Sequence, residues 1–158
     1  MRANGWLCLT VTLAMSMTVA GCDTGPQALT VERAVVRLSP NPAAPSVAYF
    51  TLKGGPVDDR LIDVLSPVAV RAELHESMTM NNPSTSSGQG MATMKPIEGG
   101  VPVPAGSTIK FEQGGKHVML FGVNARVKPD ETMALVFTFA SGSKYRIQAS
   151  VRRPGQVL

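Results

Sequence analysis

The residues best suited to bind a metal gather in one window of this 158-residue chain. Its only two histidines, His75 and His117, fall there together with five of its nine methionines: Met78, Met80, Met91, Met94 and Met119. Imidazole nitrogen and thioether sulfur form a soft, neutral ligand set, and soft ligands select Cu(I). Zinc usually adds cysteine or carboxylate ligands, and calcium and magnesium need clustered oxygens. The window therefore predicts a Cu(I) site.

The spacing within the window strengthens this interpretation. Residues two apart on a strand share a face about 6.6 Å apart, so His117 and Met119 would lie together, opposite Val118 and Leu120. In the segment 68–75 the alternation predicts a core face of Val68, Val70, Ala72 and Leu74. Arg71, Glu73 and His75 would occupy the polar face, with His75 at the end of the strand.

Short runs of β-branched and aromatic residues, separated by Gly, Pro, Asn and Asp, must position these side chains. They predict strands at 29–38, 46–53, 60–66, 68–75, 91–97, 108–112, 117–123, 132–139 and 144–152. No helical periodicity lasts three turns after residue 28. The sequence thus predicts an all-β domain, an antiparallel sandwich or Greek-key barrel of about eight or nine strands.

Two further features complete this outline. The polar segment 81–90, NNPSTSSGQG, cannot bury apolar area and predicts an exposed loop. Met133, in the apolar run 132–139, is expected in the core, because most methionines in such domains fill gaps there. Any single methionine of the window could likewise be explained as a gap filler in the core, and a lone histidine is usually structural. The prediction of a metal site depends on their conjunction.

The first 22 residues look like a targeting segment. Arg2 precedes an apolar stretch from Trp6 to Ala20, which is too short to span a bilayer and fits a secretory signal. The residues at the end of this stretch and directly after it, Val19-Ala20-Gly21-Cys22, resemble the lipobox of bacterial lipoproteins, in which the cysteine is lipidated after cleavage. The alternatives are an uncleaved N-terminal anchor, or secretion with Cys22 free. We expect a signal peptide at 1–21, a lipidated Cys22 with a tether to residue 28, a domain at 29–153 and a tail at 154–158.

Composition excludes several classes of function. With 15 basic residues, a net charge of +4 and 5% aromatic residues, the chain lacks the basic patch and stacking platform of a nucleic-acid binder. Cys8 would leave with the signal and Cys22 would carry lipid, so the mature domain would contain no thiol. A blue-copper electron-transfer site, which needs a cysteine ligand, is therefore not expected. No hydrolase elbow, phosphate loop or pair of catalytic carboxylates is evident, and we expect a protein that is not an enzyme.

These motifs together resemble the PCuAC family of periplasmic copper chaperones. The resemblance runs from about residue 29 to 152 and is carried by His75-Glu76, by Met94-Lys95-Pro96-Ile97-Glu98-Gly99, and by Gly114-Gly115 before His117-Val118-Met119-Leu120. It implies a cupredoxin-like β-sandwich that binds Cu(I) at a surface site of two histidines and two methionines. It also implies delivery of copper for assembly of the copper centre of cytochrome c oxidase.

Carried over residue by residue, the resemblance assigns His75, Met94, His117 and Met119 as the ligands. The interval between His75 and Met94 is longer than is usual in the family, and the excess matches the segment 81–90. Met78, Met80 and Met91 stay open as auxiliary or substitute ligands. The implied acceptor is cytochrome c oxidase subunit II or a Sco-type thiol protein. Asp23, directly after Cys22, resembles a signal for retention at the inner membrane, so we expect a lipid anchor at its periplasmic face.

Two alternative functions remain open from the sequence. A copper-buffering or resistance protein would use the same ligands without a dedicated acceptor. A metal-free β-sandwich interaction module would use the methionines for packing alone.

Overall fold

The computed structural model describes residues 28–79 and 92–156, and all of its regular elements are strands. They are β1 (Thr30–Arg37), β2 (Ser46–Lys53), β3 (Asp59–Leu65), β4 (Arg71–Thr79), β5 (Ala92–Pro96), β6 (Val101–Val103), β7 (Thr108–Phe111), β8 (Lys116–Phe121), β9 (Thr132–Phe139) and β10 (Lys144–Arg152). The predicted segments 68–75, 91–97 and 117–123 miss the strand boundaries by one to four residues. The short strand β6 was not predicted.

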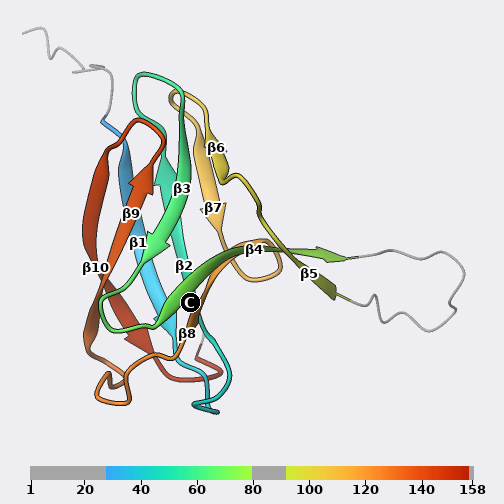
Figure 1. Cartoon of the computed structure of the whole chain (residues 1–158), viewed down its shortest axis with the longest axis vertical. Coiled ribbons are helices and arrows are strands. Elements are labelled where there is room, and N and C mark those ends of the chain that lie inside the picture. Colours follow the sequence, from blue (N-terminus) through green and yellow to red (C-terminus); the bar gives the residue numbers. More distant parts are fainter. Residues whose placement is uncertain (1–27, 80–91, 157–158) are drawn as a thin grey trace, which may run out of the picture.

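The strands form one curled sheet in the order β5-β4-β8-β7-β2-β1-β10-β9-β3-β6, and β8 also pairs with β2 (Figure 1). The prediction of an all-β fold is confirmed, with ten strands in place of eight or nine. Most pairs are antiparallel. Two are parallel, β1 with β10 and β7 with β8, so the sheet is not wholly antiparallel.

Strict alternation of burial shows why these segments are strands. Along β2, alternate residues Ser46, Ala48, Phe50 and Leu52 are buried, and along β9 the buried residues are Met133, Leu135, Phe137 and Phe139. Phe50 stacks on Phe111 with ring centroids 4.1 Å apart and meets Phe137 edge-on at 4.8 Å. Met133 is 3% exposed, which confirms its predicted place in the core.

Strands β4 and β8 share this core through one face only. Leu74 pairs with Val118 and Ala72 with Leu120, and Leu74, Val118 and Leu120 are all buried. The predicted core face of the segment 68–75 is wrong at one position. Val70 is 83% exposed, because the strand begins only at Arg71 and Val70 belongs to the preceding turn. The same shift places His75 in the middle of β4 instead of at its end.

Strand β8 lies inside the sheet, between β4 on one side and β2 and β7 on the other, whereas β5 is an edge strand paired with β4. In Figure 1, β4 curves across the sheet and its end projects outward with β5. A turn precedes β8, in which the backbone amide of Gly115 donates to Glu112 O at 3.1 Å. Gly114 in that turn has φ +81°, a conformation that glycine adopts without strain.

Candidate metal centre

The two histidines are direct cross-strand partners: His75 of β4 pairs with His117 of β8. Their ring centroids are 6.0 Å apart and the rings are tilted by 35°. His117 is 4% exposed, and the side chain of His75 is 13% exposed. Both alternate with core residues of their strands, so the pair occupies the face opposite the core.

Met119 and Met94 lie on the same face by register. Met119 is two residues along β8 from His117 and is the cross-strand partner of Glu73. Met94 of β5 pairs with Ser77, which is two residues along β4 from His75. Because residues two apart share a face of a strand, the four predicted ligands project from one face of β5, β4 and β8. Met119 is half-buried, whereas Met94 is 57% exposed.

Met78 does not share this face. It alternates with Ser77 on β4, so it projects with Glu76 and Leu74, and it is 43% exposed. Cys22, Met80 and Met91 lie outside the described residues. By register, His75, His117, Met119 and Met94 therefore share one face of the three strands, and Met78 lies on the other face.

The free nitrogens of the two imidazoles are defined by their hydrogen bonds. His117 Nδ1 lies 3.0 Å from the carbonyl oxygen of Gly115, two residues earlier on the chain. His75 Nε2 lies 3.0 Å from Glu73 Oε2. His75 Nδ1 is buried and has no hydrogen-bond partner among the described residues. A buried polar atom without a hydrogen-bond partner is rare, and this one makes His75 Nδ1 a candidate metal ligand.

Two charged residues beside the site, Arg71 and Glu73, are predicted from the sequence only as members of a polar face. Glu73 Oε2 is hydrogen-bonded to His75 Nε2, and Arg71 Nη1 donates a hydrogen bond to the other carboxylate oxygen of Glu73. The signal for these contacts was present in the spacing, because Arg71, Glu73 and His75 alternate along one strand. A charged face is, however, usually solvated, and only the structure shows that the carboxylate contacts the imidazole.

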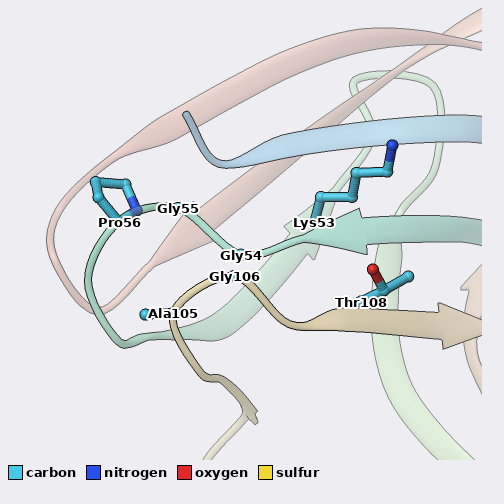
Figure 2. Close-up of a pocket in the computed structure, with 7 residues that line it drawn as sticks. All are labelled: Lys53, Gly54, Gly55, Pro56, Ala105, Gly106 and Thr108. Atoms are coloured by element: carbon cyan, nitrogen blue, oxygen red, sulfur yellow. The ribbon is translucent and has the colours of Figure 1, made fainter. Parts of the chain in front are cut away.

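The structure also contains a cavity of about 370 Å³ between the β2–β3 and β6–β7 connections (Figure 2). Its lining consists mainly of glycine, proline and alanine, and Lys53 is the only ionisable residue in it. Figure 2 shows the Lys53 side chain extending toward β1, where its ammonium pairs with Glu32 at 3.0 Å. None of the described residues His75, His117, Met78, Met94 and Met119 lines this cavity.

Within the described residues, no group of three or more His, Cys, Asp or Glu side chains is placed to hold a metal ion. Over the same ranges, no helix has the length and hydropathy needed to cross a membrane. A metal ion at the paired histidines would therefore need the neighbouring thioethers to complete its coordination.

Comparison with solved structures shows PCuAC-type relatives. The copper-bound PCuAC domain from PmoF2 matches with a TM-score of 0.59 and 17% identity, covering 82% of this chain and 97% of that one. The solution structure of CuI-DR1885 from Deinococcus radiodurans matches with a TM-score of 0.63 and 28% identity, covering 85% of each chain. The first likeness shows the fold alone, and the second extends to the sequence.

Sequence comparison gives the family. The predicted lipoprotein Lxx21020 of Leifsonia xyli subsp. xyli (strain CTCB07) is 29% identical over 92 residues, which are 58% of this chain and 51% of that protein. The match thus spans about half the length of this relative. The profile of the LpqE-like family of predicted lipoproteins matches residues 29–151. The chain therefore belongs to the LpqE-like family, and its domain has the fold of PCuAC domains.

Proposed function

We propose that this protein is an extracytoplasmic, lipid-anchored Cu(I) carrier that binds the ion through His75, His117, Met119 and Met94. One observation carries the proposal: the two histidines are cross-strand partners with ring centroids 6.0 Å apart, and both methionines project from their face. The relatives in solved structures include a copper-bound and a Cu(I)-bound protein, which supports the same ion here.

The ligand set suits a carrier. Two imidazoles and two thioethers are neutral and soft, so they favour a monovalent copper ion over harder divalent ions. Met94 is the most exposed of the four and lies on the edge strand β5, whereas His117 is almost fully buried in an interior strand. An incoming thiolate of an acceptor would displace the Met94 thioether first and the His117 imidazole last. Transfer by stepwise ligand exchange then needs no catalysis by the protein.

Delivery to cytochrome c oxidase is the finer part of the proposal. The acceptor would be subunit II of the oxidase or a Sco-type thiol protein, and a lipid on Cys22 would hold the carrier at the periplasmic face of the inner membrane. Tethering raises the local concentration of carrier beside membrane-bound acceptors. The competing function is copper buffering without a dedicated acceptor. Deleting the gene distinguishes them: loss of oxidase activity that added copper restores supports delivery, and copper sensitivity alone supports buffering.

The direct test is an anaerobic titration of the mature protein with Cu(I) in competition with a chelator. We expect one ion per chain, and we expect Met94→Leu and Met119→Leu each to weaken binding at least about tenfold, because each removes a ligand. Met78→Leu is the matched control, because Met78 is a partly exposed methionine on the opposite face of β4. Equal losses in Met78→Leu and Met94→Leu would contradict the proposed site.

A further inference from the structure

A line of three contacts runs along β4 beside the proposed copper site. Arg71, Glu73 and His75 alternate on one face of the strand. Arg71 Nη1 donates to Glu73 Oε1, and the other oxygen of Glu73 lies 3.0 Å from His75 Nε2. The guanidinium carbon of Arg71 lies 3.9 Å from the ring centroid of Phe121, which is the cross-strand partner of Arg71. Cation–π stacking therefore holds Arg71 at one end of the line, and Arg71 holds Glu73.

The contact with Glu73 decides which nitrogen of His75 carries hydrogen. An ionised carboxylate can only accept a hydrogen bond, so His75 Nε2 must donate it. In the neutral imidazole the lone pair is then on Nδ1, the buried atom without a hydrogen-bond partner among the described residues. The side chain of Glu73 is 35% exposed, so its substitution need not disturb the core.

His117 has the opposite arrangement. Its Nδ1 lies 3.0 Å from the carbonyl oxygen of Gly115, and a carbonyl also only accepts, so Nδ1 carries the hydrogen. The lone pair of the neutral ring is then on Nε2. Each histidine of the pair is thus held by a different partner in a different tautomer.

We propose that Glu73, anchored by Arg71, is a positioning residue that fixes the tautomer of His75, so that copper is bound by Nδ1 of His75 and Nε2 of His117. This inference rests on the proposed function and names the atoms of the same site. A carboxylate that accepts the second N–H of a ligating histidine fixes the ring orientation and raises the basicity of the ligating nitrogen. The buried Nδ1 of His75, which has no hydrogen-bond partner among the described residues, would be coordinated by the bound ion.

The experiment reads the tautomers directly in ¹⁵N-labelled mature protein. Long-range ¹H–¹⁵N spectra of the imidazoles are recorded without metal and after one equivalent of Cu(I) under anaerobic conditions. We expect the Nε2–H form of His75 and the Nδ1–H form of His117 in the metal-free wild type. Addition of Cu(I) should shift mainly Nδ1 of His75 and Nε2 of His117.

Variants then test whether Glu73 is responsible. Glu73→Ala should convert His75 to a mixture of tautomers and weaken Cu(I) binding about 10- to 100-fold, the range typical for loss of such a partner. Glu73→Gln should restore most of both properties, because its amide oxygen can accept the same hydrogen bond. The matched control is Glu76→Ala. Glu76 lies on the opposite face of β4 and pairs with Lys116 at 2.5 Å, so its removal should change neither the His75 tautomer nor the affinity.

Two results would overturn the inference: an unchanged His75 tautomer in Glu73→Ala, or an equal loss of affinity in Glu76→Ala. If Glu73→Ala does not fold, Arg71→Met provides the second route, because it keeps the carboxylate but removes its anchor and should raise the minor tautomer of His75. Failure of the proposed function is distinguishable from failure of this inference. A wild-type protein that does not bind Cu(I) contradicts the function, whereas the tautomers of the metal-free protein still test the role of Glu73.

Discussion

Two adjacent residues of β8 should have different roles, Val118 in the stability of the fold and Met119 in copper binding. The substitutions Val118→Ala and Met119→Leu test this. Val118 is fully buried in the core, whereas Met119 projects from the opposite face beside His117. Replacing Val118 with alanine removes two buried methyl groups, each contributing about 0.8 kcal/mol, and leaves a cavity. We expect the free energy of unfolding to fall by about 2 to 3 kcal/mol. For a domain of this size the melting temperature would drop by roughly 10 °C.

Met119→Leu should leave the stability nearly unchanged and weaken copper binding. Leucine has nearly the volume of methionine, so the stability of the metal-free protein should change by less than about 1.5 kcal/mol. The affinity for Cu(I) should fall at least about tenfold, because a thioether ligand is lost.

Thermal unfolding with and without Cu(I) measures both effects. At a free Cu(I) concentration of about 100 times Kd, binding stabilises the wild type by about 2.7 kcal/mol. Val118→Ala should have a lower melting temperature without copper, but Cu(I) should raise that temperature as much as it does in the wild type. Met119→Leu should lose about half of it or more, since a tenfold weaker affinity removes about 1.4 kcal/mol. The reasoning is refuted if folded Val118→Ala shows no rise while Met119→Leu shows the full one.

Two further predictions concern the scaffold. Burial raises the pKa of Asp59, but hydrogen bonds from the hydroxyl and amide of Ser141 and the amide of Arg60 outweigh it and lower the pKa below its ordinary 3.8. The ionised carboxylate therefore stabilises the fold above that pH, and this stabilisation is lost as the pH falls through the lowered pKa. Ser141→Ala should lower the melting temperature at pH 7, and the difference from wild type should close as the pH falls through the lowered pKa of Asp59; a difference of unchanged size in strong acid, where the carboxyl group is protonated, would contradict the cause. In the β5–β6 turn, Gly99 and Gly100 both have positive φ, but only at Gly100 would a Cβ lie 2.3 Å from a backbone oxygen. Gly99→Ala should cost about 1 kcal/mol of unfolding free energy and Gly100→Ala clearly more, as measured by denaturant titration; equal costs would contradict the close contact.

The class of the fold and the side chains able to bind a soft metal ion could both be predicted from the sequence alone. Apolar residues alternate so regularly in segments such as 132–139 and 144–152 that the predicted bounds equal those of β9 and β10. The choice of His75, His117, Met119 and Met94 came from residue types, local spacing and a family resemblance. Strand β6 escaped prediction because three residues, Val101–Val103, are too few for alternation to show.

The relative placement of these side chains could not be predicted in this way and is known from the folded structure. Local periodicity does not reveal the register between strands that are distant in the sequence. The pairing of His75 with His117 could therefore not be predicted from the sequence, nor could the placement of Met94, but not Met78, on the face of the two histidines. Each histidine also contacts a partner two residues earlier on its own segment, Glu73 for His75 and Gly115 for His117. Which ring nitrogen makes each contact depends on the side-chain rotamer, which packing in the folded sheet selects, so the tautomers could not be predicted from the sequence.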